Sequence, residues 1–329
     1  MQATPSSTPA DACPLQRRLS PPAAETLQHR RDAHHLTADQ LVSAAALALV
    51  PLAVWRADPS ILNSTALAIL AVKWLLLATG LAWLRIAPAS YLRRRSYIIA
   101  VQRLYPHASR GINLLFLALA RGGQGVVNGH GLLQAAAAVL VVLYFSQAPR
   151  SVLIAQSMEL PLPLHAALQI AGVAMLLAGS YNRDVCVTPP LTSPMTARAI
   201  DCMFAGLDIL TTMLLPILPP PGAVRPSTPG SRCQAVLAFL QLAIGLTLPV
   251  LLTAVRDAHE YDAWCMAARH DPEEHGNASA NWQAAVNGAI QRWCSWARAR
   301  PLAASTAACM LAGLIWQAVV LVLVPPGTE

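Results

Sequence analysis

Two long uncharged apolar runs restrict what this chain can fold into more than any other feature of its sequence. Residues 233–255 and 302–324 each contain 23 consecutive residues without a formal charge. A helix needs roughly 20 apolar residues to cross the hydrocarbon core of a bilayer. Only 12% of all residues are charged, against about 25% in typical soluble domains. The sequence therefore predicts an integral membrane protein and excludes an ordinary soluble enzyme and a disordered chain.

Five weaker segments bring the predicted number of spans to seven. One is long enough but contains Lys73, two carry no charge apart from a histidine, and two are short, one of them containing Asp208. Because lipid offers no partner for backbone groups, and these runs lack the alternation of barrel strands, each span should be a helix. We expect an all-α bundle of about seven transmembrane helices, with spans at 41–55, 61–84, 126–148, 160–179, 203–218, 233–255 and 302–324.

The polar segments set the expected topology. Residues 1–40 are rich in Pro, Ser, Thr and Ala and should form a disordered tail. A cytoplasmic tail places 18 basic residues inside and four outside, and basic residues in short loops mark the cytoplasmic side. We therefore expect a cytoplasmic N-terminus, a cytoplasmic loop at 180–202, an outer loop at 219–232 and a C-terminus outside or in a lumen. The sequence does not identify the membrane.

Residues 92–120 do not form a span in this scheme, because their apolar part, 112–120, is only nine residues long. In the preceding stretch Ile98, Val101, Leu104 and Tyr105 share one helical face. We interpret 92–120 as helical material that lies at the membrane interface or folds back partway. A re-entrant segment is the alternative.

The cytoplasmic loop 256–301 should contain an amphipathic helix in its second half. At 100° per residue, Trp282, Trp293 and Trp296 fall on one apolar face. Tryptophan suits the headgroup region, where the ring contacts apolar groups and the N–H stays near water, so these residues are candidate interfacial anchors. A cytoplasmic helix packed on the bundle is the equally open alternative.

Lys73 and Asp208 form the candidate site that the spans offer. Each charge costs on the order of 3 kcal/mol to place unpaired inside a membrane, so an ion pair between them would neutralise both. A transporter or proton relay could use such a pair, and a purely structural pair is also possible. In the alternative without any functional role, Lys73 extends along its side chain toward an interface and Asp208 lies in water at the membrane edge.

Patterns of catalysis, cofactor binding and metal binding are absent from the sequence. His259 opens like an HExxH zinc motif, but Ala263 stands in place of the second histidine. The seven cysteines include no CxxC pair, which disfavours both a zinc site and a disulfide framework. We therefore predict no catalytic residue, no metal and no cofactor, and favour a protein that is not an enzyme.

Function is the least determined property. The arginines lie in short clusters between apolar runs, so we expect the lipid bilayer as a partner and no nucleic acid. The leading hypothesis is a multi-pass membrane protein with a structural or regulatory role, since few polar groups fall inside the predicted spans. The alternatives are a small-solute transporter or channel that uses Lys73 and Asp208, and a membrane-embedded enzyme with His259, His270 and His275 at its cytoplasmic face.

Overall fold

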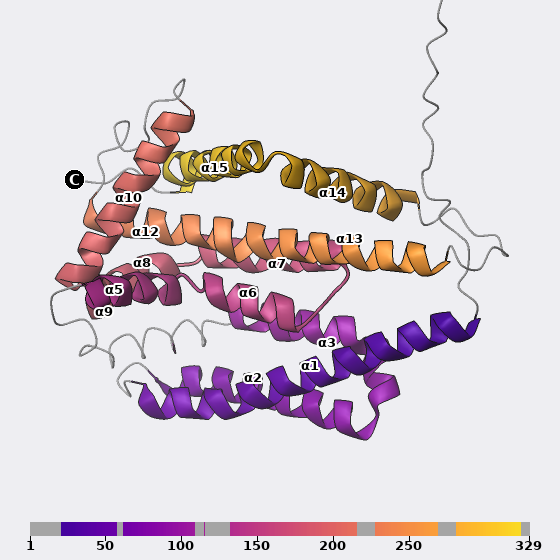
Figure 1. Cartoon of the computed structure of the whole chain (residues 1–329). Coiled ribbons are helices and arrows are strands. Elements are labelled where there is room, and N and C mark those ends of the chain that lie inside the picture. Colours follow the sequence, from indigo (N-terminus) through magenta and orange to yellow (C-terminus); the bar gives the residue numbers. More distant parts are fainter. Residues whose placement is uncertain are drawn as a thin grey trace, which may run out of the picture.

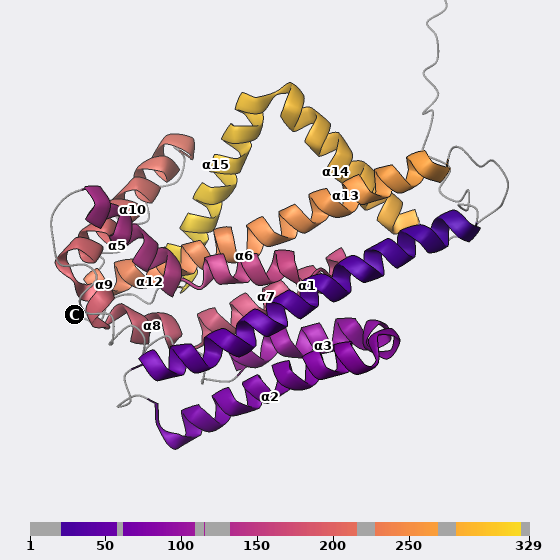
Figure 2. The same cartoon turned by 60° about the horizontal axis from the view of Figure 1, so that its bottom comes forward.

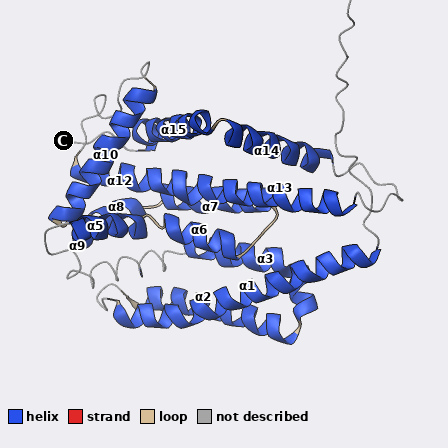
Figure 3. Cartoon of the chain, in the orientation of Figure 1, coloured by secondary structure: helices blue, strands red, loops and turns tan. Residues whose placement is uncertain are grey.

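The computed structural model of the chain describes residues 21–57, 62–108, 115, 132–215, 228–268 and 281–323. Every regular element in these residues is a helix, and Figure 3 shows no strand among them. The all-α class is thus confirmed for the described residues. The helices are α1 Pro21–Arg56, α2 Ser64–Ile86, α3 Pro88–Ala108, α5 Leu132–Phe145, α6 Ala148–Ser157, α7 Leu162–Ala178, α8 Tyr181–Cys186, α9 Pro189–Thr192, α10 Pro194–Leu214, α12 Pro229–Leu240, η1 Gln241–Thr247, α13 Leu248–Ala268, α14 Asn281–Ala299, α15 Pro301–Ala318 and η3 Val319–Leu323.

Four of the described helical segments are long and apolar enough to cross a membrane. They are Asp32–Arg56, Ser64–Ile86, Pro229–His259 and Pro301–Val322, and they coincide with four of the seven expected spans. A fifth crossing results if α5 and α6, which are bent by 62°, are taken together. The described residues therefore contain four or five helices that could span a membrane, as in a multi-pass membrane protein, and the count of seven is not confirmed.

The remaining predicted spans differ from the structure for local reasons. The apolar helix α7 has 17 residues, just short of a full crossing. The segment predicted at 203–218 belongs to α10, which begins earlier and carries Asp201 as well as Asp208. The start of the span predicted at 126–148 and the end of the one at 203–218 lie outside the described residues.

The helices form an elongated bundle with two distinct ends. In Figures 1 and 2, α1, α2, α3, α7 and α13 run along its length, and α10 crosses one end. Cys186 and Cys233 lie near that end, which we call the disulfide end. The turn between α6 and α7 places Glu159 toward the other end, which we call the Glu159 end. The largest apolar core, with Val142, Tyr181 and Trp316 among its members, lies toward the disulfide end.

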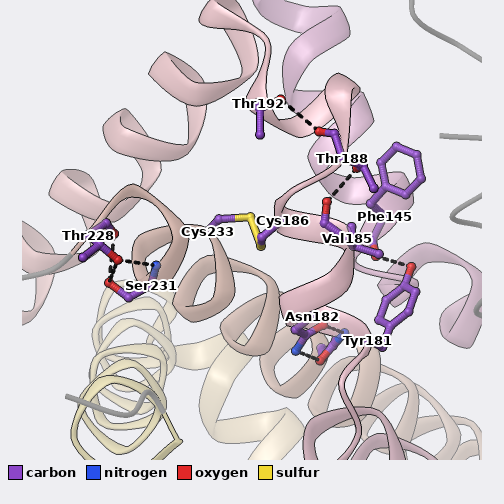
Figure 4. The surroundings of a disulfide bond; sticks show 11 residues. Phe145, Tyr181, Asn182, Val185, Cys186, Thr188, Thr192, Thr228, Ser231 and Cys233 are labelled. Carbon is purple, nitrogen blue, oxygen red and sulfur yellow. Dashed lines mark hydrogen bonds between the residues drawn. A yellow bond between two sulfur atoms is a disulfide. The ribbon is translucent and has the colours of Figure 1, made fainter. Parts of the chain in front are cut away.

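A disulfide bond corrects the predicted alternation of spans (Figure 4). Cys186 and Cys233 are bonded, with Cα atoms 5.9 Å apart. The sequence-based topology placed residues 180–202 in the cytoplasm and the start of the 233–255 span at the outer side. A hydrocarbon core about 30 Å thick cannot separate two bonded residues. The seven-span alternation is therefore wrong between these two points, and the judgement against a disulfide is wrong as well.

The first helix begins inside the segment that was predicted to be a disordered tail, 1–40. Residues 1–20 lie outside the described residues, but α1 begins at Pro21 and continues into the first apolar run. Asp39 in α1 is fully buried and His35 is nearly so. These polar residues belong to the packed bundle, which explains why the helix extends beyond the apolar run.

Helix α3 is the largest departure from the sequence-based prediction. It packs against both α2 and α7. Its buried stripe is Tyr91, Arg95, Ile99 and Arg103, spaced four residues apart. The predicted apolar face is not this stripe, and its Val101 is half exposed. Because α3 buries two arginines, it forms part of the bundle interior. Residues 109–120, apart from Leu115, lie outside the described residues.

A π-helical segment, η1, connects α12 to α13 and lets them approach α6. Pro249 follows it and has no N–H to donate, which favours such an irregular turn. A Cβ atom on Gly245 would lie 3.6 Å from the Cα atom of Ala148. The backbones of η1 and α6 are therefore neighbours at this point, at a distance where a Cβ atom would make an ordinary van der Waals contact. The carbonyl of Gly245 is free to accept a hydrogen bond from Gln169 at 2.7 Å.

The predicted Trp-rich helix is present as α14, which packs on α13 and α15. The Trp293 side chain is 44% exposed, and that of Trp296 is half-buried. The Trp282 side chain lies outside the described ones. The role of these tryptophans as interfacial anchors stays a prediction.

Candidate functional site

A buried ion pair joins α1 to α3 near the Glu159 end. The Arg95 guanidinium donates to both carboxylate oxygens of Asp39, at 2.6 and 2.9 Å. Tyr91 donates its hydroxyl hydrogen to the same carboxylate at 3.1 Å. The Asp39 side chain is 1% exposed and that of Arg95 is 8% exposed. A bidentate pair with a third donor is the geometry in which a buried carboxylate is well stabilised.

Glu159 extends this charged cluster toward α13. Its carboxylate lies 2.6 Å from Nη1 of Arg256 and 3.5 Å from Nδ1 of His35. Its backbone carbonyl accepts a hydrogen bond from Arg95. A cavity of about 260 Å³ borders this cluster, and its charged or polar lining includes Asp32 and Ser96. Four elements, α1, α3, the α6–α7 turn and α13, therefore meet around one polar cavity.

The second arginine of α3, Arg103, lies deeper in the bundle. Its Nη2 donates to the carbonyl oxygens of Ile154 and Ala155, at 3.2 and 3.3 Å, and to that of Met158. These carbonyls end α6, where a helix carries partial negative charge, so the arginine caps the helix. Nη1 of Arg103 lies 3.2 Å from Nδ1 of His165, a fully buried histidine in α7.

Beyond Arg103, a small cavity of about 20 Å³ is lined by His107, Arg150 and Gln169. Such a volume holds about one water molecule. Three buried nitrogens near it, Nε of Arg103, Nδ1 of His107 and Nε2 of His165, have no hydrogen-bond partner among the described residues. Buried polar atoms are normally paired with protein or water, so this region suits hydration.

Polar contacts continue to the disulfide end. Arg150 donates to Gln147 at 3.0 Å. The buried amides of Asn182 and Gln241 exchange two hydrogen bonds, at 3.0 and 2.9 Å, drawn as dashed lines beside the label of Asn182 in Figure 4. These buried or half-buried polar groups come from α1, α3, α6, α7, α8, η1, α13 and the turns before α6 and α7. We call them the polar column: Asp39, Arg95, Glu159, Arg256, Arg103, His165, His107, Arg150, Gln169, Gln147, Asn182 and Gln241.

The predicted pair of Lys73 and Asp208 lies on helices with different neighbours. Lys73 is in α2, which packs on α1 and α3, whereas Asp208 is in α10, which packs on α5, α12 and α15. Asp208 accepts a hydrogen bond of 2.7 Å from Nε1 of Trp316. This contact partners the carboxylate at the edge of the apolar core. The pairing of Lys73 with Asp208 stays a prediction.

The residues of the enzyme hypothesis are only partly described. His259 is exposed on α13, while His270 and His275 lie outside the described residues. Among the residues that the structure describes, no group of three or more His, Cys, Asp or Glu side chains is placed to hold a metal ion. Cys202, Cys294 and Cys309 are free thiols.

The polar column itself was not predicted from the sequence. Its acidic and arginine members come from segments assigned to the tail, the interface and the loops, where a charge is not penalised, whereas Gln147, His165, Gln169 and Gln241 lie in predicted spans. A usable signal was the four-residue spacing of Tyr91, Arg95, Ile99 and Arg103, which places two arginines on one side of a helix. Comparison of the chain with protein-family models, with curated proteins and with solved structures gave no match.

Proposed function

We propose that this membrane protein is a transporter of small polar solutes, and that its path follows the polar column. The observation that carries the proposal is the set of buried and half-buried charged and amide side chains that the described helices bring together inside the bundle. Ionisable groups inside a membrane protein are costly and commonly mark a path for ions, protons or solutes. This proposal replaces the pair of Lys73 and Asp208 with a larger set of groups as the basis of transport.

The cavity beside Glu159 supports a solute site at one end of the path. Its lining offers both signs of charge, with Arg95 and Arg256 as cations and Glu159 and Asp32 as anions. Such a lining suits a small solute with hydrogen-bond donors and acceptors or with both charges. The solute would exchange with water at the Glu159 end.

A conformational change would be required to pass the narrow centre of the column. The space near Arg103 and His107 is far smaller than the cavity beside Glu159. The bend between α5 and α6 offers a hinge, because Gln147 there has a left-handed backbone with a φ of 58°. Movement of α6 and α7 against α3 and α13 would open the column, as rocking of helices does in transporters.

We further propose the orientation of the bundle. Disulfides persist in oxidising compartments, so the disulfide end would face the periplasm, a lumen or the exterior. The Glu159 end would face the cytoplasm, where arginines such as Arg93 and Arg94 are favoured. Membrane-impermeant maleimide applied to intact cells tests this orientation at Gly230→Cys and Ser90→Cys, each in a chain whose other free cysteines, such as Cys202, are replaced by serine. Labelling of Gly230→Cys alone supports it, and labelling of Ser90→Cys alone contradicts it.

Flux into proteoliposomes tests transport. The purified chain is reconstituted with a pH-sensitive dye inside, and proton influx is measured with and without an imposed potential. A panel of radiolabelled amino acids and carboxylates is measured in parallel. We expect flux above that of empty liposomes, and a decrease of roughly ten-fold or more in His165→Leu and Glu159→Gln, which raise the barrier inside the column.

Arg198→Gln is the matched control, because Arg198 is exposed on α10 and lies outside the column. It should keep wild-type flux. Circular dichroism spectra verify that each variant is folded. Flux that is unchanged in folded His165→Leu and Glu159→Gln, or no flux of any probe above empty liposomes, would contradict the proposal.

A structural or regulatory role is the second candidate. It is favoured by the internal contacts of the charged groups, since Asp39 and Arg95 bind each other and Arg103 caps α6. In that case substitutions in the column would lower the stability of the protein, and proteoliposomes would show no flux of any kind.

A further inference from the structure

The outward side of α2 and α3 carries a groove that the polar column does not use. Its volume is about 510 Å³, within the range of small-molecule sites. Its apolar walls include Leu76 and Trp83 of α2 and Ile98 and Val101 of α3. The helices approach closely at the floor of the groove, where a Cβ atom on Gly80 would lie 2.8 Å from the Gln102 amide.

One end of the groove is cationic. The Arg94 guanidinium lies over the Trp83 ring, 5.8 Å from its centroid, and Arg94 itself is exposed. Trp83 is in the last turn of α2, so this end lies where the apolar helix meets water. Tryptophan and arginine at such a boundary are typical of the membrane interface. The rest of the groove follows the candidate span Ser64–Ile86, where acyl chains surround the protein.

We propose that this groove binds an anionic phospholipid. Its phosphate group lies at Arg94, and one acyl chain lies along Thr79, Ile98 and Val101. The occupant follows from charge complementarity and from position: an apolar trough inside the membrane ends at a cation at the headgroup level, and basic pockets between transmembrane helices bind anionic lipid headgroups. The site does not depend on transport by the polar column, because no column residue lines the groove.

Native mass spectrometry of the full chain in detergent tests the site. The probes are phosphatidylglycerol and phosphatidylcholine with identical acyl chains. We expect the wild-type chain to bind phosphatidylglycerol about five-fold more tightly, which corresponds to the attraction of one arginine for an anionic surface. Arg94→Gln should reduce this ratio to about one, because it removes the charge but leaves the apolar trough.

Two further variants separate the groove from general attraction. Arg93→Gln is the matched control: it removes an exposed neighbouring charge that does not line the groove, and the ratio should be unchanged. Thr79→Phe adds an aromatic ring to the exposed wall and should weaken the binding of both lipids. Equal binding of the two lipids by the wild-type chain, equal losses in Arg93→Gln and Arg94→Gln, or unchanged lipid binding in Thr79→Phe would overturn the proposal. All three positions are exposed on the helix surface, so these variants should fold.

Discussion

Removal of one partner of the Asp39–Arg95 pair should destabilise the protein far more than removal of both. Asp39 accepts hydrogen bonds from Arg95 and Tyr91, so Asp39→Leu leaves a buried guanidinium and a buried hydroxyl without their acceptor. Breaking a buried ion pair from one side costs about 3–5 kcal/mol. Arg95→Met leaves the Asp39 carboxylate in the same position. Each single variant should therefore lose about 3 kcal/mol or more of unfolding free energy.

The double variant, Asp39→Leu with Arg95→Met, removes both charges together. Apolar residues of similar volume often replace a buried pair at little cost, so its loss should be smaller than the sum of the single losses by about 3 kcal/mol or more. The assay is unfolding of the purified chain by sodium dodecyl sulfate in mixed micelles, followed by circular dichroism. Additivity within about 0.5 kcal/mol would refute a buried pair.

The exposed pair of Arg232 and Asp201 provides the control for this cycle. Their side chains are 2.9 Å apart but 35% and 49% exposed. Exposed pairs contribute about 0–1 kcal/mol, so Arg232→Met and Asp201→Leu should each change the unfolding free energy only slightly. The contrast between the two pairs isolates burial as the cause, because both pairs join an arginine to an aspartate across helices.

Two smaller perturbations test the packing of the bundle. Gly172→Val should lower the unfolding free energy by about 1–3 kcal/mol, because a Cβ atom there would lie 3.1 Å from the His107 ring. Gly206→Ala should be nearly neutral, since nothing lies within 4 Å of a Cβ atom at that position. Equal effects of the two variants in the same detergent unfolding assay would contradict this packing. The denatured chain should expose at least two more thiols to maleimide after reduction than before it, because Cys186 and Cys233 are bonded. Equal counts would disprove the disulfide.

Hydrophobicity alone predicts the parts of the fold that lipid dictates. The uncharged run 233–255 falls inside the long helical segment Pro229–His259, and most of the run 302–324 lies in Pro301–Val322, because a helix is the structure that satisfies its own backbone within a membrane. The amphipathic period around Trp293 likewise predicts α14. In these segments local composition and the final structure depend on the same physical requirement.

Pairwise contacts account for what the sequence did not reveal. Arg95 gives α3 the composition of an interfacial segment. Its contacts with distant groups, the Asp39 carboxylate 56 residues away and the Glu159 carbonyl, make its burial favourable. A hydropathy criterion assigns each charged residue its full cost of transfer into the membrane and does not include the stabilisation that a distant partner provides. The disulfide is a similar case, because nothing near Cys186 indicates a bond to a residue 47 positions away.

The distribution of arginines between the two sides of the membrane was also interpreted with a wrong order of spans. With Cys186 beside Cys233, the segment between α7 and α10 cannot lie across the membrane from the start of α12. The small number of polar groups within the predicted spans favoured a structural role. That number was low because α3 was assigned to the interface, and it rises once Arg95 and Arg103 are placed in the bundle interior.

Nitroxide labels on adjacent sides of α3 test most directly whether its charged stripe faces the interior. Tyr97 is 78% exposed, whereas Ile99 lies within the buried stripe and is fully buried. In proteoliposomes, with the other free cysteines replaced by serine, a label at Tyr97→Cys should be mobile and accessible to oxygen, and a label at Ile99→Cys should be immobile and inaccessible. Equal mobility at both positions, or the reverse order, would place Arg95 and Arg103 outside the bundle and leave it without a polar column.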